Sequence, residues 1–328
     1  MRTNRRLALE SMGMLGSLAA LTPARVAAQP AFPTRPVKLV MPHAAGGPTD
    51  LMARAIAAHA SQTLGQQMFV ESRVGASGNI GTEFVARAEP DGYTVLYQTS
   101  GITIVPALFK KLNYDPLRSF APVAMPASIN VVLLAGPALP VNNFAEFARH
   151  LKANPGKLTY GSGGTGNITH LGVEVLLQAL GASAVHVPYK GTAPAMADLL
   201  GGQIHFMLDA VSTAWPYVKD RRVTALAVTG AERSPLMPNL PTVRESGLAI
   251  QPMATWQCVL APAGTPPAVV DILNRAVNAA AADQELQRRH AAQGVQLQTS
   301  TPAQVQSYMR AEVERWAGVA RGAGIVPE

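Results

Sequence analysis

Short apolar runs alternate with helical patterns along most of the chain, and this alternation is what most restricts the fold. The run PVKLVM at 36–41 ends in a Gly/Pro cluster and precedes a helical pattern over 49–63. The runs MFVESR and TVLYQ, the second one after the turn PDGY, continue the series. Repeated strand–helix units predict an α/β fold with a mostly parallel sheet and helices on both of its faces.

Two long extended segments, at 121–135 and 253–261, bracket a second series of alternating strands and helices. After the second segment we expect only helices, over 267–281, 284–292 and 302–321. This order predicts two α/β domains joined by two crossing strands. Domain 1 then comprises residues 29–132 and 254–328, and domain 2 is the inserted segment 133–253.

The first 28 residues differ from the rest of the chain. A basic start, a short apolar stretch and the small residues Val26, Ala27 and Ala28 are typical of a secretory signal peptide cleaved near Ala28, by either the general or the twin-arginine route. Its removal lowers the net charge from +7 to +4, because the segment holds four Arg and one Glu. So mild a charge, without a dense Lys/Arg run, predicts no nucleic-acid partner. We expect a periplasmic protein.

The stretch YGSGGTGNITHLG at 160–172 allows two interpretations. Gly161, Gly163 and Gly166 spell G-x-G-x-x-G between a strand and a helix, the pattern of a nicotinamide-dependent oxidoreductase. That function requires an acidic residue after the next strand, and AVHVPYKG offers none. The alternative is a helix N-terminus that favours another anion, with Asn167 as the N-cap and His170 orienting the loop from N3.

Seven segments in order support a family resemblance. They are PVKLVMPHAAGGPTDLMAR, PDGYT, NYDPLRSFAPV, LTYGSGGTGNITHLG, HVPYKGTAPAMADLLGGQ, RVTALAVTGAERSPLMPNLPTVRESG and LAPAGTPPAVVDILN. On these segments the chain resembles the extracytoplasmic solute receptors of the tripartite tricarboxylate transporter type, the Bug family. The resemblance implies a two-domain, type II-like periplasmic binding protein fold, with mixed sheets flanked by helices and two hinge strands. It implies a receptor and no enzyme, which captures a small organic acid or amino acid between its domains, in some members for membrane permease subunits.

The candidate ligand contacts lie where strands end. Gly46 and Gly47 follow the first strand and let backbone amides approach a ligand, and Thr49 or Asp50 is expected to cap the next helix. In the resembled family this loop and the loop at 161–170 both reach the ligand. The full set of candidates is Gly46, Gly47, Thr49, Asp50, Ser100, Gly101, Gly163, Gly166, Asn167, Thr169, His170 and Asp209. Asp209 has two readings, a partner for a ligand amine or a cap for the helix that begins near Val211.

Neither Arg nor Lys occurs in 42–50, 98–104 or 161–170. We therefore expect neutral donors to meet a ligand carboxylate, at roughly 1.5–3 kcal/mol for each hydrogen bond to a charged group. Lys190 is the nearest candidate cation by motif, with a solvated lysine as the equal alternative. His43 is expected to pack near the rim of the cleft. No cofactor, metal site or catalytic residue is predicted, since the histidines are scattered and nucleophile motifs are absent.

Overall fold

The structure, a computed structural model, describes residues 32–43, 45–46 and 48–327. The leader expected at residues 1–28 and the predicted contact Gly47 lie outside this part of the chain. Among the described residues no helix combines the length and apolar character that crossing a bilayer requires.

Ten strands of the described residues form one sheet, in the order β2-β1-β3-β9-β4-β7-β5-β6, while β8 and β10 also pair with β4. The strands are β1 (Val37–Met41), β2 (Met68–Ser72), β3 (Thr94–Thr99), β4 (Phe120–Ala135), β5 (Thr159–Ser162), β6 (Val185–Pro188), β7 (Phe206–Ala210), β8 (Thr224–Val228), β9 (Ala254–Pro262) and β10 (Val295–Leu297).

Helices follow most strands, as the alternation of the sequence predicts. They are α1 (Pro48–Leu64), α2 (Asn79–Ala86), α3 (Gly101–Ile104), α4 (Phe144–Ala153), α5 (Ile168–Leu180), α6 (Thr192–Leu200), α7 (Val211–Lys219), α8 (Pro267–Ala282), α9 (Gln284–Ala291) and α10 (Pro302–Gly322), with 3-10 turns η1 (Ala76–Gly78) and η2 (Val105–Ala107). In α4 the predicted apolar face is confirmed, because Phe144, Phe147 and Leu151 are buried.

The direction of strand pairing separates the two strand–helix series from the strands that join them. β1 pairs in parallel with β2 and β3, and β5 pairs in parallel with β6 and β7. β4 and β9 run antiparallel to each other and to the strands beside them. The sheet is therefore mixed, and the expectation of a mostly parallel sheet holds only inside each series.

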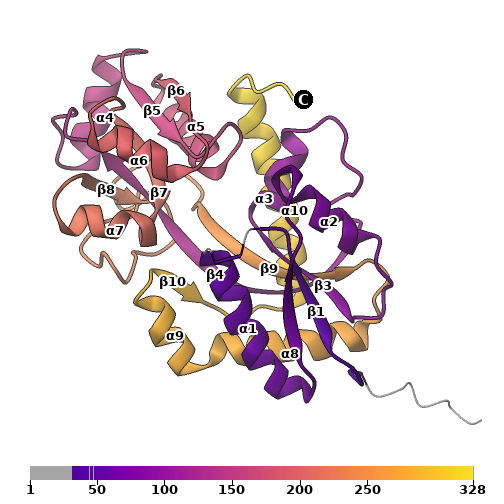
Figure 1. The fold of residues 1–328 in the computed structure, drawn as a ribbon. Helices are drawn as coiled ribbons and strands as arrows, with labels where there is room; N and C mark the ends of the chain where they lie inside the picture. The colour runs from indigo at the N-terminus through magenta and orange to yellow at the C-terminus, as the bar shows by residue number, and fades with distance from the viewer. Residues whose placement is uncertain (1–31, 44, 47, 328) are drawn as a thin grey trace, which may run out of the picture. The chain divides into compact units, whose positions relative to one another are not determined.

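β4 takes part in both halves of the sheet. Its residues 120–130 pair with β9, and its residues 131–135 pair with β7. Figure 1 shows β4 and β9 side by side at the middle of the sheet. The extended segments predicted at 121–135 and 253–261 are thus confirmed as strands at the junction of the two series.

The prediction of helices alone after residue 261 is wrong, because β10 lies between α9 and α10. It pairs antiparallel with residues 127–129 of β4. A strand of three residues has no measurable periodicity, so only the neighbouring strand reveals it.

The helices bury two main clusters against the sheet. α1 and α8 pack on β1 and the first part of β4, while α4 and α5 pack on the second part of β4. The C-terminal helix α10 contributes Val305 and Met309 to a cluster with β3 and β9, and Trp316 to the cluster around α5. Both series therefore have apolar cores, and α10 packs against each of them.

Candidate ligand-binding site

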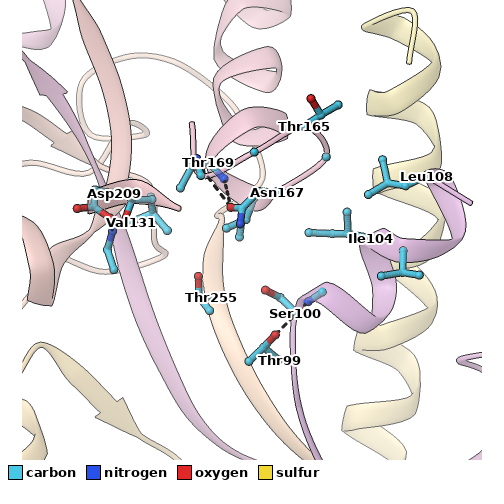
Figure 2. Close-up of a pocket in the computed structure, with 18 of the residues that line it drawn as sticks. Thr99, Ser100, Ile104, Leu108, Val131, Thr165, Asn167, Thr169, Asp209 and Thr255 are labelled. Carbon is cyan, nitrogen blue, oxygen red and sulfur yellow. Dashed lines mark hydrogen bonds between the residues drawn. The ribbon is translucent and has the colours of Figure 1, made fainter. Parts of the chain in front are cut away.

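A pocket of about 590 Å³ opens where strands of both series end. Its walls come from the end of β3 with α3 and η2, the loop between β5 and α5, the end of β7, the start of β9, and the C-terminal residues (Figure 2). The lining residues are His43, Thr99, Ser100, Gly101, Ile104, Val105, Leu108, Phe109, Val131, Gly163, Gly164, Thr165, Gly166, Asn167, Ile168, Thr169, Thr192, Asp209, Ala210, Thr213, Thr255, Ile325 and Val326.

The loop at 161–170 is held by hydrogen bonds among its own residues. Asn167 is the N-cap of α5, and its Oδ1 accepts from the Thr169 amide at 3.0 Å. The Thr169 hydroxyl accepts from the Gly163 amide at 2.8 Å. The helix begins at Ile168, so the predicted cap and the N3 position of His170 are both confirmed.

His170 orients this loop from outside the pocket wall. Its Nδ1 accepts from the Gly166 amide at 3.0 Å, and its ring stacks on His186 with centroids 3.8 Å apart. Burial, together with the neighbouring His186, lowers the pKa of His170 to about 4. Burial likewise lowers the pKa of His186 to about 4. The His170 ring is therefore neutral at pH 7, and its Nδ1 can accept the hydrogen bond from the Gly166 amide.

Gly166 is the point where the loop contacts the opposite wall. Its φ of +74° lies in the left-handed region, and a Cβ there would lie 2.3 Å from Cδ1 of Leu108. A side chain at position 166 is thus disfavoured for two reasons: the backbone conformation is one that glycine favours, and the Leu108 side chain occupies the space that a Cβ would need. Of the other predicted residues, Gly163, Asn167 and Thr169 line the pocket with Gly166, whereas His170 supports them from behind.

The segment 42–50 contributes less than the sequence predicts. The Gly46 amide donates to Oδ2 of Asp50 at 2.9 Å, and the Arg54 guanidinium donates to the same atom at 3.0 Å. The hydrogen bond from Arg54 lowers the pKa of Asp50. Because α1 begins at Pro48, the prediction that Thr49 or Asp50 occupies the cap position is wrong, and both lie in the first turn.

His43 is the described residue of this segment that lines the pocket, whereas Gly46, Thr49 and Asp50 lie outside its wall. It is half-buried, and its Nε2 lies 2.8 Å from Oε1 of Gln98, which agrees with the expected position at the rim.

Ser100 and Gly101 line the pocket at the end of β3, as predicted. Ser100 is buried, and its amide donates to the Trp256 carbonyl at 2.9 Å, which ties this end of β3 to β9. A strand end followed directly by a polar residue and glycine was the signal that pointed to this pair.

Asp209 faces the pocket from β7 and is 3% exposed. Its Oδ1 accepts from the Ala210 amide at 2.8 Å. Burial raises the pKa of Asp209, and hydrogen bonds from Thr213 and Thr192 offset this in part. The alternative in which Asp209 caps α7 does not hold, because Ala210 occupies the cap position without a side-chain cap bond.

Several lining residues were not anticipated from the sequence. Thr192, Thr213 and Thr255 reach the pocket from three separate elements, and no local pattern marks them. The apolar lining by Ile104, Leu108 and their neighbours had a visible signal, because ITIVPALF directly follows the predicted Ser100–Gly101 contact.

Among the described residues that line the pocket there is neither a lysine nor an arginine. Lys190 is exposed and lies outside this lining, so the solvated alternative describes its position. Within the described part of the chain, no group of three or more His, Cys, Asp or Glu side chains could hold a metal ion.

The structural context of the dinucleotide fingerprint is present, but the ribose partner is not. β5, the loop and α5 follow in order, and β6 pairs in parallel with β5. The residues at the end of β6, Pro188 to Gly191, include no carboxylate to hold a ribose. The observed residues therefore do not support the nicotinamide interpretation.

An α/β fold with a pocket at strand ends from two series is typical of a solute-binding protein. Residues 52–325 match the model of the tripartite tricarboxylate transporter family receptor. The chain belongs to this family.

Known relatives cover nearly the whole chain. A protein of Agrobacterium vitis, the UPF0065 protein in the TAR-I ttuE-ttuC' intergenic region, is 37% identical over 90% of this chain and 87% of its own length. The structure of the periplasmic binding protein BugD is 38% identical, with a TM-score of 0.74 over 90% of this chain and 100% of that one. Rpa4515 of R. palustris with adipate is 36% identical, with a TM-score of 0.77 and the same coverage. The solved relatives thus include a periplasmic binding protein, BugD, and a protein with a small acid, adipate.

Proposed function

We propose that this protein is a periplasmic receptor that captures a small carboxylated solute in the pocket and delivers it to permease subunits of a tripartite transporter. Export with cleavage after Ala28 is part of the proposal. The observation that carries it is the pocket of about 590 Å³ at the strand ends of a solute-receptor family member. A relative of 36% identity holds adipate, a small dicarboxylic acid.

Side-chain donors are suited to receive the carboxylate. The amides of Gly163, Gly166 and Thr169 already donate inside the loop, so the donors left to a ligand differ from those expected. Oδ1 of Asn167 accepts within the loop, which leaves its amide nitrogen for the pocket. With the hydroxyl of Ser100 it offers neutral donors, each worth roughly 1.5–3 kcal/mol toward a charged group.

We further propose that the segments 29–132 with 254–328 and 133–253 act as two domains that close on the ligand. β4 and β9, at the junction of the two series, are the hinge strands of this proposal. Closure would bring Gly46, Gly47, Thr49 and Asp50 toward the solute, where the family resemblance expects them.

The proposal is tested by native mass spectrometry of the purified protein and by calorimetry with adipate. A matched pair of variants locates the site: Thr99→Phe fills the pocket, while Thr94→Phe adds the same ring at the other end of β3. Both threonines are half-buried, but only Thr99 lines the pocket. We expect a retained small acid in the wild type and in Thr94→Phe, and its loss in Thr99→Phe.

Equal acid binding by the two variants would show that the solute lies elsewhere. Retention of an uncharged molecule, with no binding of any acid offered, would contradict a carboxylate receptor.

A further inference from the structure

One wall of the pocket is apolar. Ile104 and Val105 are buried there, and Leu108 and Phe109 are half-buried beside them. Figure 2 shows Ile104 and Leu108 on the side of the pocket opposite Asp209. A charged ligand group against this wall would lose its water and gain no hydrogen bond, which is costly.

The opposite side holds the buried carboxylate of Asp209, and the described residues of the lining include neither a lysine nor an arginine to balance its charge. This side chain is 3% exposed, and its oxygens accept from the Ala210 amide and from the side chains of Thr192 and Thr213. An ionised carboxylate has about four acceptor positions. A buried carboxylate without a cation is either protonated or stabilised by additional hydrogen-bond donors. For Asp209, a further donor can approach from the pocket.

Neutral donors lie between these two sides. Figure 2 places Asn167, Thr255 and Ser100 between Asp209 and Ile104. A ligand that spans the pocket therefore meets three different chemistries in sequence: an acceptor, neutral donors and an apolar wall.

We propose that the solute is a carboxylate that also carries an ammonium group, held by Asp209, and an apolar body, packed on the wall of Ile104, Val105, Leu108 and Phe109. The inference rests on the proposed function, since the neutral donors in the middle take the carboxylate. It narrows the ligand class to amphiphilic amino acids and separates this chain from receptors of dicarboxylic acids such as adipate.

The test uses L-leucine and three probes that each lack one feature. 4-Methylpentanoate lacks the ammonium group, 3-methylbutylamine lacks the carboxylate, and L-aspartate replaces the apolar branch with a charged group of similar size. Calorimetry at pH 7 with the full mature protein gives each dissociation constant. We expect L-leucine to bind best, with a loss of roughly ten-fold or more in affinity, or about 1.4 kcal/mol, for each missing feature. For the two charged groups the loss comes from a charge-assisted hydrogen bond, and for L-aspartate it comes from a charged group placed against the apolar wall.

Variants assign the features to residues. Asp209→Asn keeps an acceptor for the Ala210 amide. In this variant the dissociation constant of L-leucine should be close to that of 4-methylpentanoate. The control Asp198→Asn alters a carboxylate of α6 that accepts from the Tyr189 hydroxyl and does not line the pocket. It should leave the preference for L-leucine unchanged. If Asp209→Asn does not fold, the comparison of the two acids on the wild type still decides the role of the ammonium group.

The outcomes separate this inference from the proposed function. Binding of 4-methylpentanoate as tight as that of L-leucine would show that Asp209 is protonated and would overturn the inference, while the carboxylate receptor stands. Tighter binding of L-aspartate or adipate than of L-leucine would overturn the claim that an apolar body of the solute packs on the wall of Ile104 and Leu108. Equal binding of 3-methylbutylamine and L-leucine would show that the pocket does not recognise the carboxylate, and this result would contradict the proposed function as well.

Discussion

The segments 42–50 and 161–170 each join a buried strand to a helix through glycines, and the sequence predicts the same anion-binding role for both. Every residue from Gly163 to Thr169 lines the pocket, whereas His43 is the described residue of 42–50 that does so. In 42–50 the Asp50 carboxylate already accepts from the Gly46 amide. In 161–170 the amides bond to neutral acceptors, and no negative charge of the loop itself faces the ligand.

This difference shows that a glycine loop before a helix is not in itself an anion site. An acidic residue in the first turn can satisfy the loop and the helix dipole from within. A neutral cap such as Asn167 satisfies the geometry and leaves the local potential favourable for a bound anion.

The largest expected contrast is between Gly166→Ala and Gly46→Ala. Both glycines have positive φ, which costs an L-residue about 1–2 kcal/mol. A Cβ at Gly46 meets nothing within 4 Å, whereas at Gly166 it would meet Leu108 at 2.3 Å, which adds roughly 1–3 kcal/mol of overpacking. Urea unfolding should therefore show the greater loss of stability for Gly166→Ala.

Adding Leu108→Ala to Gly166→Ala should recover part of the loss in a double-mutant cycle. Equal losses at the two glycines would contradict the contact between the loop and Leu108.

The second contrast is in pH dependence. The pKa of His170 in the folded state, about 4, lies below its ordinary 6.5, so the unfolded state binds more protons between these values. The free energy of unfolding should therefore fall as the pH falls from 6.5 to 4, by on the order of 3 kcal/mol for this group. For Asp50 the pKa is lowered from 3.8, so its contribution is present above pH 3.8 and is lost only below it.

Unfolding curves across this pH range check the assignment. His170→Gln, whose carbonyl can accept from Gly166, should weaken the dependence between pH 6.5 and 4 and leave the part that comes from His186. Asp50→Asn should leave that window unchanged. A wild-type slope in His170→Gln would exclude His170 as the titrating group.

A third contrast concerns the two helix starts. Asn167→Ala removes the N-cap of α5 and should cost about 1 kcal/mol, whereas Asn167→Ser keeps a cap and should cost a few tenths. Thr49→Ala should change stability by less than about 0.5 kcal/mol, because Thr49 is not a cap. Thermal and urea unfolding measure all three, and a loss at Thr49 equal to that at Asn167 would restore the capping role predicted from the sequence.

The smallest effect is expected for Arg54→Gln. The Arg54 side chain is 51% exposed, so its ion pair with Asp50 should contribute less than about 1 kcal/mol and weaken in salt. Asp50 keeps the Gly46 amide in this variant. A large loss of stability would mean that the ion pair, rather than the amide bond, holds the segment 42–50.

Local patterns predicted much of the fold and part of the site. The strand at 121–135, the buried face of α4 and the cap at Asn167 depend on residues close in sequence, so periodicity and composition reveal them. The pair Ser100–Gly101 was found for the same reason, because a strand end is a local feature.

What the sequence by itself determined is the alternation of strands and helices, the family and the residues at several strand ends, since each depends on short-range pattern. Only the tertiary structure decided that Thr255 and Thr192 meet Asn167 in one pocket, that Gly166 packs against Leu108, and that β10 pairs with β4. These contacts join residues far apart along the chain. Their geometry follows from how the sheet and the helices pack, which no local window of sequence records.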